Sequence, residues 1–139
     1  MFSKDRKKAW IGQVQTLKKL ENKFGKAVEK MSKCTVAGSV GKGVLRPKND
    51  EEILGYEEQA MYRSGVGMLL WLTKTRLDIC NAIRELTKAC GRATEESMME
   101  MKRIIKFVLD TKEIGLKFEP NDNNETMEMW ELTAFSDSD

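Results

Sequence analysis

The chain has 139 residues, a net charge of +2 and an apolar fraction of 40%, which suits one domain, or part of a larger one, with a hydrophobic core. The absence of histidine excludes Ser-His-Asp and Cys-His nucleophilic systems, and three widely spaced cysteines fit neither a disulfide framework nor a zinc site. No apolar run approaches the roughly 20 residues of a transmembrane helix, and the charged N-terminus does not resemble a secretory signal, so we expect an intracellular protein, cytoplasmic or nuclear, with no membrane partner.

Positive charge is concentrated in the N-terminal third. Residues 1–50 contain 13 Lys and Arg against 4 Asp and Glu, whereas residues 51–100 contain 6 against 9 and residues 101–139 contain 5 against 9. Such clustering is one feature of proteins that contact a phosphate backbone, but charge alone is not diagnostic and favours the alternative interpretation. The alternative is a solvated lysine face that binds nothing.

Residues 9–24 begin with a short apolar piece and continue with apolar residues at three- and four-residue steps. Most lysines fall off this stripe, and Gly25 follows where a helix C-terminal glycine is expected. The pattern predicts a basic amphipathic helix that ends near Phe24, with a long connecting loop over residues 25–58. The apolar stripe consists of Val14, Leu17, Leu20 and Phe24.

Residues 59–112 predict a three-helix segment. The first helix, over residues 59–74, is apolar on every side and is therefore expected to be buried, with glycines near its start that permit close approach by another part of the chain. Asp78 is the expected N-cap of the second helix and Thr94 that of the third, which has two glutamates in its first turn. The expected core face of the third helix is Met98, Met101, Ile105 and Val108.

The C-terminal region changes to a strand pattern. Residues 116–118 and 130–134 alternate between apolar and polar side chains on either side of a polar turn at residues 120–124, which predicts a β-hairpin. Because a lone hairpin is marginally stable, we expect the sheet to continue beyond this sequence. The predicted fold class is α+β, mainly helical.

Several segments carry distinctive motifs. Residues 62–72 read Y-R-S-G-V-G-M-L-L-W-L, residues 75–79 read T-R-L-D-I, residues 102–111 read K-R-I-I-K-F-V-L-D-T, with G-L-K-F soon after, and residues 135–139 read F-S-D-S-D. In this order they resemble the Y-R-S-x-V-G-x-L-L-Y-L, T-R-P-D-I, K-R-I-L-R-Y-L-K-G-T and Y-S-D-A-D elements of Ty1/copia-type retrotransposon Pol polyproteins. Residues 10–25 look like the strand and helix that follow the polymerase palm in that family.

The resemblance covers nearly the whole chain and implies three segments. Residues 1–58 would be a C-terminal remnant of the reverse transcriptase with its basic helix and loop, residues 59–112 a helical connection, and residues 113–139 the truncated N-terminal hairpin of RNase H. The sequence departs from the family pattern at Leu77, which replaces a proline, and at Ser97, where many members have histidine.

The parent protein would carry out RNA-directed DNA polymerisation and hydrolysis of RNA in RNA–DNA hybrids. Both reactions use two Mg²⁺ ions held by clustered carboxylates. The family's palm motif is Tyr-x-Asp-Asp, and this sequence contains no Asp-Asp dipeptide. The resemblance maps one RNase H metal ligand onto Asp137, whose partners would lie beyond Asp139. We therefore expect a fragment that is not an enzyme and has no cofactor of its own, although the intact parent requires Mg²⁺.

The resemblance also implies the binding partners, which are RNA–DNA hybrid or template–primer and the rest of the Pol polyprotein. The basic side chains are the candidates for phosphate contact, and a solvated helix edge is the alternative for each. The candidate residues are Lys18, Lys19, Lys23, Arg63, Lys102, Arg103 and Lys106.

Two other hypotheses come from different classes of protein. One is a host-retained nucleic-acid-binding module that uses the basic N-terminal third, for which binding should weaken steeply as salt rises. The other is a helical protein-interaction module, which should retain a specific partner. Coding sequence for the palm upstream and for RNase H downstream would favour the polyprotein fragment over both.

Overall fold

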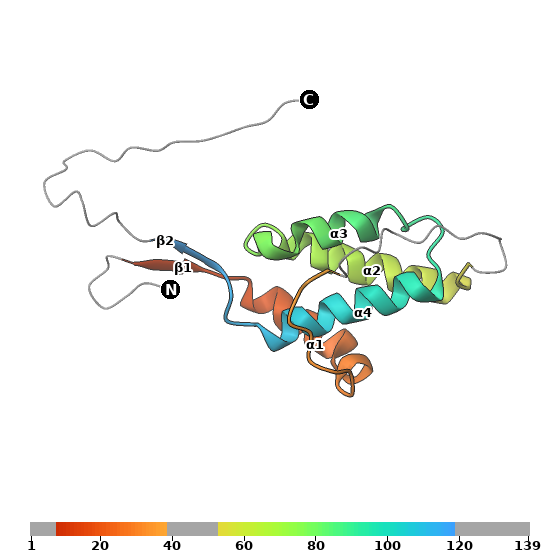
Figure 1. Cartoon of the computed structure of the whole chain (residues 1–139), viewed down its shortest axis with the longest axis horizontal. Helices are drawn as coiled ribbons and strands as arrows, with labels where there is room; N and C mark the ends of the chain where they lie inside the picture. The colour runs from red at the N-terminus through yellow and green to blue at the C-terminus, as the bar shows by residue number, and fades with distance from the viewer. Residues whose placement is uncertain (1–7, 39–52, 119–139) are drawn as a thin grey trace, which may run out of the picture. The chain divides into compact units, whose positions relative to one another are not determined.

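A computed structural model of the chain describes residues 8–38 and 53–118, and it confirms a mainly helical α+β fold (Figure 1). Four α-helices, one 3-10 turn and one two-stranded sheet make up this part of the chain. The elements are β1 (Ala9–Ile11), α1 (Val14–Val28), α2 (Tyr56–Leu72), η2 (Leu77–Ile79), α3 (Cys80–Thr87), α4 (Glu95–Asp110) and β2 (Leu116–Phe118).

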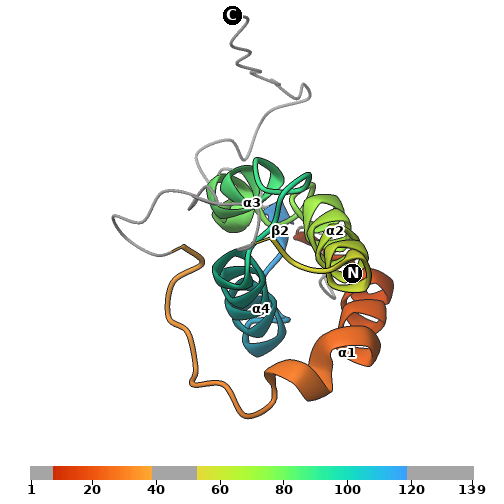
Figure 2. The ribbon, with the colours of Figure 1, turned by 90° about the vertical axis from the view of Figure 1, so that its right-hand side faces the viewer.

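The helices pack around one hydrophobic core. Helices α2 and α4 contact each other, α1 packs against both, and α3 packs against both from another side (Figure 2). All four helices lie in one compact unit, residues 11–116, while residues 8–10 and 117–118 belong to a second unit. Helix α1 therefore shares its core with the later helices, across the predicted segment boundary at residue 58. The largest fully buried side chains are Phe24, Leu20, Tyr62, Leu69, Leu72, Ile79, Ile83, Met101, Ile104 and Ile105.

The basic helix is present, but its predicted end at Phe24 is wrong. Helix α1 continues through Gly25 to Val28, whose side chain is 2% exposed. A glycine inside a helix costs about 1 kcal/mol relative to alanine. Burial of a valine contributes about 1.5 to 3 kcal/mol, so packing of Val28 outweighs that cost.

The first helix of the three-helix segment is not buried on every side, which corrects the prediction from its apolar sequence. Leu69 and Leu72 are buried, whereas Leu70 is 51% exposed and Trp71 is 56% exposed. Only one stripe of α2 meets the other helices, because a helix at the edge of a four-helix arrangement keeps an outer face. The outer face of α2 is thus unusually apolar.

Close approach occurs at one of the two glycines of α2. A Cβ atom at Gly65 would overlap the sulfur of Met101 on α4 and would lie 3.1 Å from the ring of Phe24 on α1. Nothing lies within 4 Å of the corresponding position at Gly67. Gly65 therefore allows α1, α2 and α4 to meet, whereas Gly67 faces open space.

Asp78 is not the N-cap that its position suggested. It lies within η2, and α3 begins at Cys80 without a side-chain cap. Its carboxylate instead accepts hydrogen bonds from Nε and Nη2 of Arg76, at 2.9 and 2.7 Å. Arg76 also donates to the carbonyl oxygen and the hydroxyl of Thr111, both at 2.9 Å. Asp78 thus binds the guanidinium of Arg76 and does not cap the N-terminus of α3.

The third predicted helix is confirmed in its start and its core face. Thr94 is the N-cap of α4, and its hydroxyl accepts a hydrogen bond from the backbone N–H of Ser97. Two glutamates occupy the first turn, where the helix dipole favours negative charge. The buried side chains of α4 include all four predicted ones, Met98, Met101, Ile105 and Val108.

The predicted strand at residues 116–118 is present as β2, and it pairs with β1. Residues 130–134, the other strand of the predicted hairpin, lie outside the described residues. Gly115 precedes β2 at a point where an added Cβ would lie 2.6 Å from the carbonyl oxygen of Ile11, so the backbones approach closely there. Among the described residues, no helix has the length and apolar character needed to cross a membrane.

The two glycines of α2 give a matched test of the packing. We expect Gly65→Ala to lower the free energy of unfolding by about 1 to 2 kcal/mol, because Met101 and Phe24 must move. Gly67→Ala should raise it by about 0.5 to 1 kcal/mol through helix propensity alone. Urea unfolding followed by circular dichroism measures both, and equal changes of the same sign would contradict this packing.

The ion pair of Arg76 and Asp78 predicts a pH dependence. The hydrogen bond from Arg76 holds the pKa of Asp78 below its ordinary value. The stabilisation is therefore complete above the unfolded-state pKa of about 3.9 and is lost as the pH falls through the lower folded-state pKa. Because the Asp78 side chain is 35% exposed and solvent screens the pair, Asp78→Asn should cost about 1 kcal/mol near neutral pH. The difference from the wild type should disappear in acid, and a difference independent of pH would argue against the pair.

Candidate nucleic-acid interface

Helix α1 and the residues just after it carry a dense run of lysines. Between residues 18 and 33 the chain has six lysines and two glutamates. Lys18 and Lys19 are exposed, and no carboxylate in the described part of the chain pairs with either. Glu21 is already bound to Lys112 at 2.6 Å. The exposed face of α1 therefore keeps uncompensated positive charge in water, where a phosphate backbone can reach it.

Lys23 connects α1 to α2. Its ammonium group donates a hydrogen bond to the hydroxyl of Ser64 at 2.6 Å and lies 5.8 Å from the ring centroid of Phe24. Lys19 is one helical turn before Lys23 and so lies on the same side of α1. These lysines border the line along which α1 and α2 meet, which we call the α1–α2 seam and define by Lys19, Lys23 and Ser64.

Arg63 is not brought together with the lysines of α1. It is exposed on α2, but successive residues of a helix point about 100° apart, and Ser64 is the residue that faces α1. Arg63 instead affects the pKa of Cys90, which follows α3. Burial raises the pKa of the Cys90 thiol, and the positive charge of Arg63 partly offsets this increase. Its charge therefore lies on the side of α2 that faces α3.

The basic residues of α4 are mostly engaged within the protein. Arg103 binds Glu100 through two hydrogen bonds, at 2.9 and 2.7 Å, and this interaction raises the pKa of the guanidinium. Lys106 pairs with Asp110 at 2.8 Å, and both side chains are less than one-fifth exposed. Lys102 is half-buried on the same helix. Of the predicted contacts on α4, two thus have a carboxylate partner that offsets their charge.

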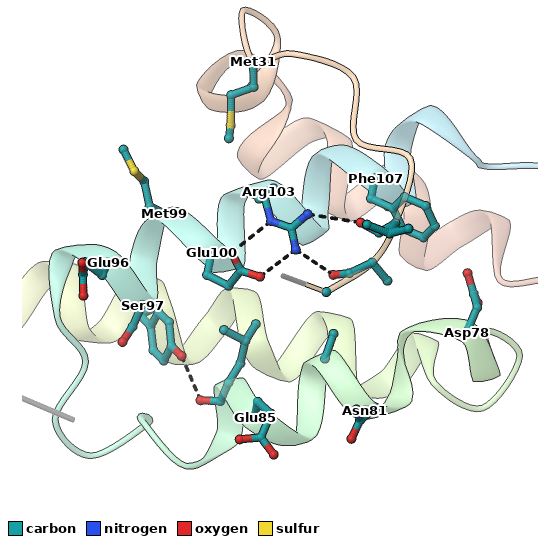
Figure 3. A pocket seen from close by; sticks show the side chains of 16 residues that line it. Met31, Asp78, Asn81, Glu85, Glu96, Ser97, Met99, Glu100, Arg103 and Phe107 are labelled. Carbon is teal, nitrogen blue, oxygen red and sulfur yellow. Dashed lines mark hydrogen bonds and ion pairs between the residues drawn. The ribbon is translucent and has the colours of Figure 1, made fainter. Parts of the chain in front are cut away.

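Arg103 has a second structural role at the loop that follows α1. Its guanidinium donates hydrogen bonds to the carbonyl oxygens of Val36 and Ala37, both at 3.2 Å. The loop and α4 together form one wall of a groove of about 730 Å³, whose other wall is α3 (Figure 3). Figure 3 shows Arg103 pointing at this loop, with Glu100 beside it. Its donors are thus largely used within the fold.

The groove has an apolar floor and an acidic rim. Tyr62 and Phe107 contribute to the floor, and the Tyr62 hydroxyl donates a hydrogen bond to the carbonyl oxygen of Leu86 at 2.8 Å. Burial raises the pKa of Tyr62 well above its ordinary value, so this hydroxyl stays protonated. Four of the lining residues are acidic and one is basic: Asp78, Glu85, Glu96, Glu100 and Arg103. Because Asp78, Glu85 and Glu100 form ion pairs with Arg76, Lys88 and Arg103, the groove offers little uncompensated positive charge to a phosphate backbone.

Trp71 and Lys74 lie near the α1–α2 seam but were not among the candidate residues predicted from the sequence. Trp71 is 56% exposed, and the ammonium group of Lys74 lies 3.5 Å from the centroid of its ring. Ser64 and Trp71 are seven residues apart and therefore share a face of α2. That spacing was visible in the sequence, but the pairing of this face with α1 was not.

The predicted RNase H ligand cannot be placed. Asp137 and Asp139 lie outside the described residues. Within residues 8–38 and 53–118, no three His, Cys, Asp or Glu side chains form a group that would hold a metal ion. The described residues therefore provide no set of ligands that fits the two Mg²⁺ ions of the resemblance.

Comparison with known proteins gives no relative. No protein-family model matches the chain, and no curated protein or solved structure matches it either.

Proposed function

We propose that the chain is a segment of a Ty1/copia-type Pol polyprotein in which helix α1 contacts nucleic acid next to the polymerase palm. The parent activities would be RNA-directed DNA polymerisation and RNase H cleavage, and the rest of the polyprotein would be the main protein partner. Within this segment, α1 would bind the phosphates of RNA–DNA hybrid or template–primer.

The contact between two of the motifs carries this proposal. Arg76, from the T-R-L-D-I motif, is 2% exposed and binds Asp78 of the same motif. It also binds Thr111, the last residue of the K-R-I-I-K-F-V-L-D-T motif, through both the hydroxyl and the carbonyl oxygen. A contact between the two motifs is what the resemblance requires if they form one structural unit. Tyr62, the first residue of the Y-R-S-G-V-G-M-L-L-W-L motif, donates a hydrogen bond to the carbonyl oxygen of Leu86 on α3.

The distribution of charge supports nucleic acid as the ligand of α1. The exposed lysines of α1 lack carboxylate partners in the described part of the chain, whereas the groove beside α4 is acidic. Each phosphate that a lysine neutralises releases counterions, which favours binding at low salt. The face of α1 is thus suited to phosphates, and the groove is not.

Binding to RNA–DNA hybrid tests the proposal directly. The full chain should bind a hybrid duplex at low salt, with an affinity that falls linearly in a plot of log K against log salt. Lys18→Ala/Lys19→Ala should weaken binding and reduce the magnitude of that slope by about 1 to 2. Fluorescence anisotropy over a salt series measures both quantities.

A second double variant controls for net charge. Arg84→Ala/Lys88→Ala removes the same charge from exposed positions at the end of α3 and leaves the Glu21–Lys112 pair of α1 intact, so binding should change far less. If the two double variants lose affinity equally, α1 is not the interface. If the unmodified chain does not bind hybrid at low salt, the proposal fails altogether.

We further propose that the chain contacts nucleic acid without catalysing a reaction. Two-metal phosphoryl transfer requires a cluster of carboxylates, and the sequence has no Asp-Asp dipeptide and one residue that matches an RNase H ligand. Purified chain with Mg²⁺ should neither extend a primer nor cleave the RNA of a hybrid. Activity that persists after rigorous removal of contaminants would overturn this expectation.

A helical protein-interaction module is the second candidate, and the groove between α3 and α4 favours it. An apolar floor with an acidic rim suits a basic amphipathic segment of another protein. This candidate predicts stable capture of a specific protein and no binding of hybrid. The hybrid-binding experiment therefore separates the two functions.

A further inference from the structure

Trp71 combines exposure with a fixed backbone. Single exposed apolar side chains are common and by themselves indicate nothing. Here, however, the side-chain amide of Gln13, the residue before α1, donates hydrogen bonds to the carbonyl oxygen of Trp71 at 2.9 Å and to the hydroxyl of Thr75 at 3.3 Å. The C-terminal turn of α2 is thereby tied to α1. The indole is presented to solvent from a rigid support, which lowers the entropy cost of binding.

In this structure one face of the Trp71 indole is covered by the ammonium group of Lys74. This ammonium group lies 3.5 Å from the ring centroid, and the Lys74 side chain is exposed. An exposed cation–π contact is worth about 0.5 to 1 kcal/mol. Stacking of a nucleobase on an aromatic side chain is worth about 1 to 3 kcal/mol, so a base can replace the ammonium group. The displaced lysine then remains close enough to pair with the phosphate of the same nucleotide.

The α1–α2 seam continues from this indole as a basic track. Ser64 lies seven residues before Trp71 on the same face of α2, a distance of about 10 Å along the helix. Lys23 reaches across to Ser64, and Lys19 lies one turn closer to the N-terminus of α1. A strand with duplex-like stacking, at about 3.4 Å per nucleotide, covers this length with three nucleotides, and a more extended single strand covers it with fewer. The spacing suits one base at the indole with its neighbouring phosphates at the lysines.

From this juxtaposition we infer that Trp71 is a stacking platform for an unpaired base, with the phosphates of that single strand following the α1–α2 seam. The inference rests on the proposed contact with nucleic acid. It commits to single-stranded nucleic acid, because the bases of a duplex are stacked on one another and do not offer a face to an indole on a helix surface. A template–primer contains both kinds of region, a duplex and an unpaired template strand.

Two probes of equal charge isolate the stacking contribution. One is an oligonucleotide of about 15 thymidines, and the other has the same number of phosphates but no bases. Trp71→Ala should weaken binding of the thymidine probe by about 5- to 150-fold, and it should change binding of the abasic probe by less than about 2-fold. Trp71→Phe should recover most of the lost affinity, because phenylalanine also offers an aromatic face.

Leu70→Ala is the matched control. Leu70 is the adjacent residue, is similarly exposed at 51%, and points about 100° away from Trp71 around the helix. It should bind both probes as the wild type does, and urea midpoints of all variants should show that each is folded.

The outcomes separate this inference from the proposed function. Equal losses for both probes in Trp71→Ala, or a similar loss in Leu70→Ala, would overturn stacking while leaving the phosphate contact of α1 in place. Unchanged binding of the thymidine probe in Trp71→Ala would do the same. Failure of every probe, including hybrid duplex, would overturn both proposals.

Discussion

The buried guanidinium of Arg76 is the interaction on which the arrangement of the helices depends most. It lies in the turn between α2 and α3 and reaches the C-terminus of α4, with its carbon Cζ 5.6 Å from the ring centroid of Phe107. Three of the helices are therefore joined at one side chain. A guanidinium has five N–H donors in a planar fork, and here they meet a carboxylate, a carbonyl and a hydroxyl. No other side-chain type could satisfy that set, and lysine would leave acceptors unpaired.

Among the described residues, positive charge is divided between internal pairs and open surface. Arginine and lysine side chains toward α4 are used inside the fold, because Arg103 holds the loop after α1 and Lys106 holds Asp110. In the described part of the chain, the lysines of α1 make no comparable internal bond, apart from the hydrogen bond of Lys23 to Ser64. A basic side chain that is paired with a carboxylate stabilises the fold. An exposed basic side chain without such a partner is open to a ligand. Sequence position alone does not reveal that difference.

The core and the outer face of α2 illustrate the limits of pattern reasoning. Leu69, Leu70, Trp71 and Leu72 form one apolar run, so periodicity could not distinguish their sides. Packing buries Leu69 and Leu72 and leaves the middle two exposed. The two exposed side chains differ in direction, because Trp71 lies on the side of α2 that faces α1 and Leu70 does not. The candidate stacking site follows from that pairing, which depends on contacts between residues far apart in the chain.

Local chemistry was sufficient for several features of this protein. The Thr94 cap, the buried face of α4 and three residues of the α1 stripe, Leu17, Leu20 and Phe24, depend on neighbours within a few residues, so the sequence by itself determined them. Val14, the fourth residue predicted for that stripe, is 61% exposed, because it lies at the start of α1 beyond the contact with the other helices. The extension of α1 through Gly25, the recruitment of Asp78 by Arg76, and the division of lysines between internal ion pairs and open surface were decided by the tertiary structure. In each of these cases the decisive contact is made with residues that are brought together by packing or with a competing side chain. The free energy of that contact exceeds the local conformational preference that can be read from the sequence.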